Sequence, residues 1–66
     1  MNYLYFLELI HPTRQREILE TIISYYSKDL SENAARVRIY RKLESCDELK
    51  GQDFKSIGDL IFNHYV

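Results

Sequence analysis

The sequence predicts an all-α fold, a small bundle of three to four short helices that form a single domain over residues 1–66. Apolar residues recur at helical spacing in several segments, polar N-cap residues precede two of them, and the few Pro and Gly residues separate them. With 45% hydrophobic and 29% charged residues, the chain has the composition of a folded domain. Its lone cysteine, Cys46, rules out a disulfide within the chain, so we expect stability to depend on packing and on partners.

The first segment, Tyr3 to Ile10, is nearly all apolar. A helix with one face made of Tyr3, Phe6, Leu7 and Ile10 and a fully buried strand both fit this pattern, and we prefer the helix. Glu8 interrupts the segment, which also lacks the positive start of an export signal and is shorter than the roughly 20 apolar residues that span a bilayer. We therefore expect it to belong to the fold, with no membrane contact.

The second segment is predicted to be a helix that begins at Pro12, because proline is favoured in the first turn of a helix. Charged residues occupy its other faces, and Lys28 and Asp29 end it. Its apolar positions are Ile18, Leu19, Ile22, Ile23, Tyr25 and Tyr26.

The third predicted helix runs from Glu32 to about Ser45, with Ser31 as its N-cap. Alternation over residues 36–43 leaves a half-buried strand open as an alternative, although the cap and the Ala34-Ala35 pair favour a helix. The residues that share its apolar side are Ala35, Ile39, Tyr40, Leu43 and Cys46.

A fourth helix is expected after Gly51, which is predicted to end the preceding structure, with Asp53 as its N-cap. Its apolar stripe consists of Phe54, Ile57, Ile61 and Tyr65.

No motif for catalysis, metal binding or cofactor binding is present, so we expect a protein that is not an enzyme and that has no cofactor. Cys46 could pair with His11 or His64 only if it left the apolar side of its helix, where a buried inert thiol is the commoner outcome. These three residues are too scattered for a structural zinc site, and no glycine-rich phosphate loop occurs.

The residues that we predict to contact a partner combine arginines, a lysine and tyrosines. Arg38, Arg41 and Lys42 fall within about 100° of one another on the predicted third helix, opposite its apolar side, although a merely solvated face is the alternative interpretation. Arg36 points toward the apolar side, where it could snorkel to solvent, pair with a carboxylate or mark an interface at the edge of the core. Six tyrosines exceed what so small a core can bury, and tyrosine and arginine are enriched at interfaces. The alternative is that the rings are half-buried with solvated hydroxyls and contact no partner. The predicted partner-binding residues are Tyr25, Tyr26, Arg36, Arg38, Arg41 and Lys42.

Part of the chain resembles the Hha/YmoA family of small enterobacterial nucleoid modulators. The matching run is LETIISYYSKDLSEN from Leu19 onward, where the family also pairs Leu-Glu with an Ile and a later acidic-Leu-Ser-acidic turn. The positions that match are Leu19, Glu20, Ile22, Ile23, Asp29, Leu30, Ser31, Glu32, Glu48 and Leu49. The resemblance implies a four-helix protein that binds the oligomerising domain of the H-NS nucleoid protein. Leu43, Glu44 and Ser45 stand where the family has an Asp-His-Arg motif.

A second segment, Thr13 to Tyr26, is similar to the first helix of LexA-type winged helix-turn-helix domains, which would make residues 54–61 a supporting helix. This likeness implies direct DNA binding, although the segment between supplies no recognisable turn and recognition helix.

The net charge of -1 provides no general attraction to nucleic acid or to an anionic membrane, and a single free cysteine fits the reducing cytoplasm. We therefore predict a cytoplasmic, non-enzymatic protein–protein interaction module that binds and modulates a larger partner, such as a transcription or nucleoid-associated protein. We expect it to form a homodimer or to remain bound to that partner. The alternatives are a small helix-turn-helix-like DNA-binding protein and a phage- or plasmid-encoded inhibitor of a host protein.

Overall fold

The computed structural model describes residues 3–66, except for the side chains of Tyr3, Leu4 and Phe6. The helices are α1 (Tyr3–Leu9), α2 (Pro12–Tyr26), α3 (Glu32–Glu44) and α4 (Phe54–Tyr65), and a single 3-10 turn, η1 (Asp47–Leu49), precedes α4. Residues 3–66 contain no strand, which confirms the all-α prediction and excludes the strand alternatives over residues 3–10 and 36–43. Within the predicted face of the first helix, Leu7 and Ile10 are buried, whereas the side chains of Tyr3 and Phe6 lie outside the described part.

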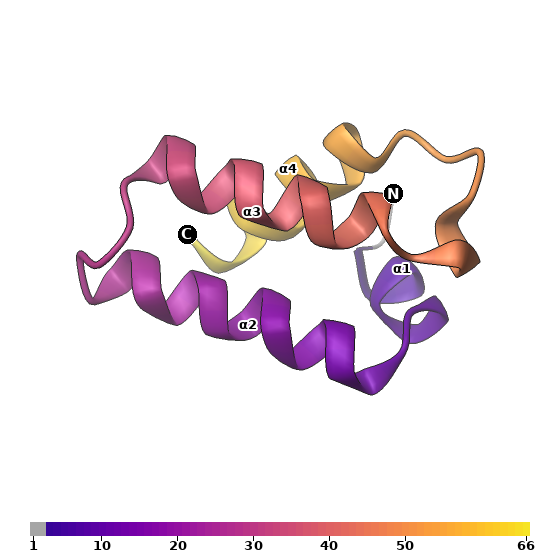
Figure 1. The fold of residues 1–66 in the computed structure, drawn as a ribbon, viewed down its shortest axis with the longest axis horizontal. Helices are drawn as coiled ribbons and strands as arrows, with labels where there is room; N and C mark the ends of the chain where they lie inside the picture. Colours follow the sequence, from indigo (N-terminus) through magenta and orange to yellow (C-terminus); the bar gives the residue numbers. More distant parts are fainter. Residues whose placement is uncertain (1–2) are drawn as a thin grey trace.

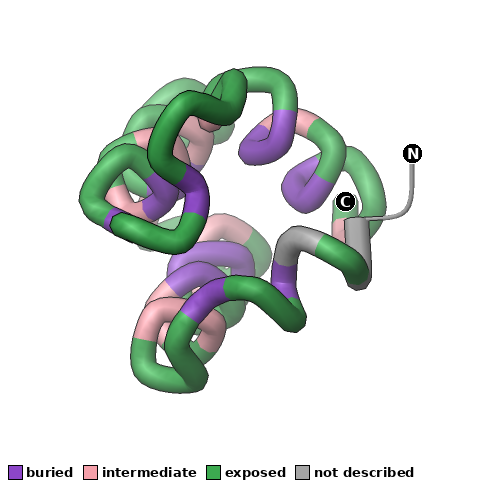
Figure 2. Tube along the Cα trace, turned by 90° about the vertical axis from the view of Figure 1, so that its right-hand side faces the viewer, coloured by how far each residue is buried: buried purple, intermediate pink, exposed green. Residues whose placement is uncertain are grey.

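Helix α3 occupies the centre of the bundle, with α2 packed on one side of it and α4 on another. Figure 1 shows α2 and α3 running in opposite directions side by side, α4 behind α3, and α1 near the start of α2. Helix α1 contacts α4 and η1. In Figure 2 the buried positions of the helices face the space between them, as expected when each helix contributes one stripe to a shared core.

The core is small and built mainly from branched aliphatic side chains. Burying a side chain of this kind contributes roughly 1.5–3 kcal/mol relative to leaving it in water. The largest fully buried residues are Ile18, Ile39, Leu43, Ile61 and Phe62, which come from α2, α3 and α4.

Local signals in the sequence set where the longer helices begin. Ser31 Oγ accepts a hydrogen bond from the Ala34 amide at 3.1 Å, and Asp53 Oδ1 accepts one from the Ser56 amide at 3.2 Å, so both predicted N-caps are confirmed. Helix α2 begins at Pro12 as predicted. Its N-cap is His11, whose Nδ1 accepts a hydrogen bond from the Thr13 amide at 3.1 Å, a role that the sequence analysis did not assign.

The turn between α2 and α3 has the hydrogen bonding of a Schellman motif. The Asp29 amide donates to the Ser24 carbonyl at 2.9 Å, and the Lys28 amide donates to the Tyr25 carbonyl at 3.0 Å. Lys28 has a φ of 64° and so adopts the left-handed conformation that this position requires and that glycine usually supplies.

Gly58 allows α3 and α4 to approach closely. It is buried in α4, and a Cβ atom at this position would lie only 2.7 Å from Cδ1 of Tyr40 on α3. The absence of a side chain therefore makes room for the Tyr40 ring at the helix contact.

Candidate interaction surfaces

Arg36 joins α3 to α4 through several contacts. Its Nη1 lies 2.8 Å from Oδ1 of Asp59, its Nη2 donates to Oδ1 of Asn63 at 2.9 Å, and its Nε lies 3.2 Å from Oε2 of Glu32 on its own helix. The guanidinium carbon stands 4.3 Å from the centre of the Phe62 ring, within the range of a cation–π interaction. The predicted pairing of Arg36 with a carboxylate is therefore present, and the guanidinium group makes its contacts within the bundle.

Tyr40 belongs to the same network, because its hydroxyl donates a hydrogen bond to Oδ1 of Asp59. The hydrogen bond to this carboxylate, and then burial, raises the pKa of Tyr40 above its usual value. Burial disfavours the charge on Arg36, but its hydrogen bonds to Glu32 and Asp59 outweigh that effect and raise its pKa. The network therefore favours a neutral tyrosine beside a charged arginine.

Lys42 joins α3 to α2, so it does not lie opposite the apolar side as predicted. Its Nζ is 2.6 Å from Oε2 of Glu17, and Arg14 Nη1 lies 3.0 Å from the same oxygen. The hydrogen bond from Lys42 is the main reason that the pKa of Glu17 is lowered. Within the predicted basic stripe, Lys42 is half-buried against α2, whereas Arg38 and Arg41 remain exposed, and Arg38 lines a hollow at the α2 boundary together with Lys42.

The neighbouring tyrosines at the end of α2 have different environments. Tyr25 is half-buried, with its ring centre 5.2 Å from that of Phe62 in an edge-on arrangement. Tyr26 is 58% exposed, and its hydroxyl donates a hydrogen bond to the backbone carbonyl of Tyr65. Of the predicted pair, Tyr26 is therefore the one whose ring is available at the surface.

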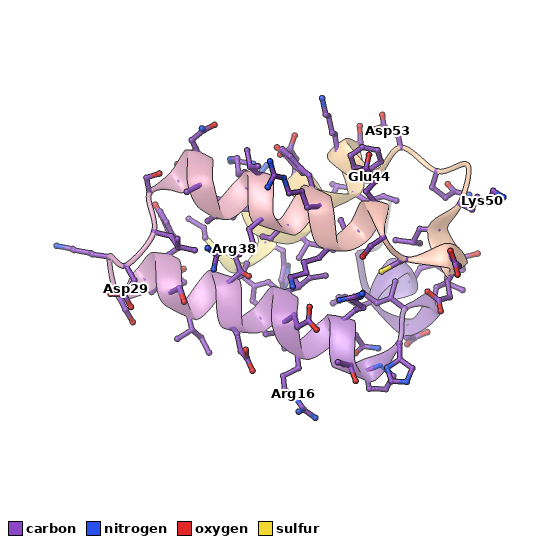
Figure 3. The ribbon with its side chains drawn as sticks, viewed as in Figure 1. Arg16, Asp29, Arg38, Glu44, Lys50 and Asp53 are labelled. Carbon is purple, nitrogen blue, oxygen red and sulfur yellow. The ribbon has the colours of Figure 1, made fainter. Side chains whose placement is uncertain are left out.

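The outer side of α3 carries a shallow groove that is lined by Arg38, Arg41 and the partly exposed Val37. Neither arginine forms an ion pair with any residue in the described part of the chain. Figure 3 shows Arg38 on α3 near the boundary with α2. We call this surface the α3 groove; its lining residues are Asn33, Ala34, Val37, Arg38 and Arg41.

A second surface lies on α2, where Leu19, Ile23 and Tyr26 are 38%, 62% and 58% exposed. We call these three residues the outer stripe of α2. They were predicted as part of one apolar helix face, but the core accommodates only the adjacent inner positions. The apolar face is wider than a small core can cover, and this width is the signal in the sequence that could have indicated an exposed stripe.

Cys46 is buried, and its thiol donates a hydrogen bond to the Lys42 carbonyl with a sulfur–oxygen distance of 3.1 Å. Burial, and then the nearby charge of Glu48, raises its pKa, which disfavours the reactive thiolate. Within the described residues, no three His, Cys, Asp or Glu side chains are grouped so that they could hold a metal ion.

Comparison of the chain with protein-family models, curated proteins and solved structures gives no match. None of the helices within residues 3–66 combines the length and the apolar character needed to cross a membrane.

Proposed function

We propose that this chain is a non-enzymatic interaction module that binds a larger protein through the α3 groove. The observation that carries the proposal is that the exposed side chains of Arg38 and Arg41, which form no ion pair with a described residue, line one groove together with Val37. Guanidinium groups form bidentate hydrogen bonds with carboxylates, and arginine is enriched where proteins meet. The groove would therefore suit a partner segment that presents acidic side chains next to an apolar one.

The other cations of the predicted patch support this choice of surface. Arg36 and Lys42 hold α3 against its neighbouring helices, so their charges are already matched and α3 is fixed in place. A rigid helix loses little conformational freedom when it binds, and this favours affinity. The resemblance to the Hha/YmoA family stays a prediction. Because of it, we propose that the partner is a cytoplasmic transcription or nucleoid-associated protein. The alternative is that the chain is encoded by a phage or plasmid and that its partner is a host protein that it inhibits.

Charge reversal tests the groove directly. We expect the double variant Arg38→Glu/Arg41→Glu to lose a protein that the wild type captures from its native cell, as identified by mass spectrometry. Lys50→Glu/Lys55→Glu is the matched control, because it makes the same charge change at two exposed lysines outside the groove. Capture of the same proteins by both double variants would contradict the proposal.

Direct DNA binding through the same two arginines is distinguished by a titration with a short duplex. Phosphate contacts make affinity fall steeply with added salt, by a slope that grows with the number of contacts. If the wild type binds the duplex with such a slope and Arg38→Glu/Arg41→Glu abolishes binding, the groove is a nucleic-acid surface and the protein-partner proposal fails.

A further inference from the structure

The outer stripe of α2 has the spacing of a helix-pairing seam. Arg16, Leu19, Ile23 and Tyr26 follow one another at intervals of three, four and three residues, which is the a and d pattern of a heptad. All four are exposed, and the last three present apolar or aromatic surface. A second apolar seam beside a buried one indicates that α2 has a further packing partner.

The position of the stripe leaves room for a whole helix. Glu17 marks the side of α2 that faces α3, through its ion pair with Lys42. At 100° per residue, the four seam residues lie about 100° to 180° around the helix from Glu17. In Figure 1, α2 forms the lower edge of the molecule, with no other helix beneath it.

We propose that the occupant of this stripe is α2 of a second copy of the chain, packed antiparallel about a two-fold axis that crosses the stripe at the level of Thr21, whose own side chain is buried on the opposite side of α2. Leu19 and Ile23 are each two residues from Thr21, so Leu19 of one copy faces Ile23 of the other across the axis. Arg16 and Tyr26 are each five residues away and face one another in the same manner. Four layers result, and every layer joins an a position to a d position.

The charges at the ends of α2 favour this orientation. Figure 3 shows Arg16 projecting below α2 and Asp29 projecting near the far end of the same edge, and neither forms an ion pair with a described residue. In the antiparallel pair, the Arg16 guanidinium lies over the Tyr26 ring of the second copy, where a cation is attracted to the π face. Asp29 of the second copy follows Tyr26 by three residues, just beyond the end of its α2, so a negative charge stands at the end of the pair where Arg16 lies. A parallel pair would instead place Arg16 beside Arg16.

One contact opposes the pairing and provides a test of its register. Glu20 is exposed at the edge of the stripe, one residue from the axis, so the Glu20 side chains of the two copies come close together. Like charges in facing positions weaken an interface. Removing this charge is therefore expected to strengthen the dimer.

The interface is small, because 15 residues of α2 extend only about 22 Å. We therefore expect self-association that depends on concentration, with the mass in sedimentation experiments rising from 8.0 kDa toward twice that value between micromolar and millimolar protein. Ile23→Glu should remain monomeric throughout this range with unchanged circular dichroism, because Ile23 is 62% exposed in the single chain. Glu20→Gln should lower the dimer dissociation constant several-fold.

Val37→Glu is the matched control, because it places the same charge on an exposed apolar side chain of α3. It should dimerise like the wild type and lose the larger partner. Ile23→Glu should stay monomeric and still bind the larger partner. Failure of the dimer and failure of the α3 groove are thus detected separately. A wild type that stays monomeric at millimolar concentration, or an Ile23→Glu variant that associates as strongly as the wild type, overturns the inference.

The relative orientation of the two α2 helices in the dimer is tested by disulfide formation between Leu19→Cys and Ile23→Cys proteins that are mixed in equal amounts. The antiparallel arrangement predicts that the mixed disulfide forms faster than either homodisulfide, because facing a and d side chains lie at disulfide distance. Faster formation of both homodisulfides would indicate a parallel pair and would refute the proposed register.

Discussion

Among the positively charged side chains on the helices, Arg36 should be the one whose replacement lowers the stability of the fold most. Replacing it with alanine removes an ion pair to a 45% exposed Asp59, a hydrogen bond to Asn63 and a cation–π contact with Phe62. A partly exposed ion pair contributes about 0.5 kcal/mol, the hydrogen bond about 0.5 kcal/mol and the aromatic contact about 1 kcal/mol. We therefore expect Arg36→Ala to lower the free energy of unfolding by about 2 kcal/mol.

Urea denaturation followed by circular dichroism measures this loss, which corresponds to a fall in melting temperature of about 8–16 °C for a domain of this size. Arg38→Ala is the control, because it removes the same side chain from an exposed position on the same helix that has no ion pair with a described residue. That change is expected to stay within about 0.5 kcal/mol of the wild type. Equal effects of the two substitutions would show that the α3–α4 contacts of Arg36 do not stabilise the fold.

Three further substitutions test local features of the fold. Lys28→Gly should raise the free energy of unfolding by about 0.5–1 kcal/mol in the same denaturation assay, because it relieves the left-handed backbone at φ 64°. Gly58→Ala should lower it by about 1–3 kcal/mol despite the better helix propensity of alanine, since the new Cβ would press on the Tyr40 ring; a stabilised variant would show that the helices move apart easily. Glu17→Gln should reduce the loss of stability in acid. The hydrogen bond from Lys42 lowers the pKa of Glu17 in the folded state. The stabilisation by the Glu17 carboxylate is therefore fully present above the ordinary pKa of 4.5 and is lost as the pH falls through the lowered pKa. A series of thermal melts between neutral pH and pH about 3 would show this change. It would be contradicted if the melting temperature of the variant fell with acid as steeply as that of the wild type.

The boundaries of the helices were predictable because their signals are local. Ser31 and Asp53 cap helices through side chains that reach an amide three residues away, and Pro12 is favoured at a helix start wherever it occurs. His11 was missed because an imidazole is not among the usual N-cap side chains. The left-handed Lys28 was missed for a similar reason, since the sequence has no glycine at that position.

The roles of the charged residues were less predictable because they depend on the arrangement of the helices. The helical positions of Arg36 and Lys42 are fixed by the sequence pattern, but their carboxylate partners on the neighbouring helices lie 23 and 25 residues away along the chain. The different environments of the two tyrosines also depend on tertiary packing, since Tyr25 packs inward against Phe62 of α4 while Tyr26 stays at the surface. Periodicity identifies a face of a helix, and tertiary packing decides how much of that face is covered.

The central place of α3 has a consequence for how the molecule opens. Helix α2 rests on one side of α3 and α4 on another, while α2 and α4 meet through a few aromatic side chains near their ends. Either outer helix could therefore detach for a moment and leave the other docked on α3, but the departure of α3 would remove the main packing partner of both. Hydrogen exchange should accordingly be slowest at the amides beside Ala35, Ile39 and Leu43, which open only when the entire chain unravels.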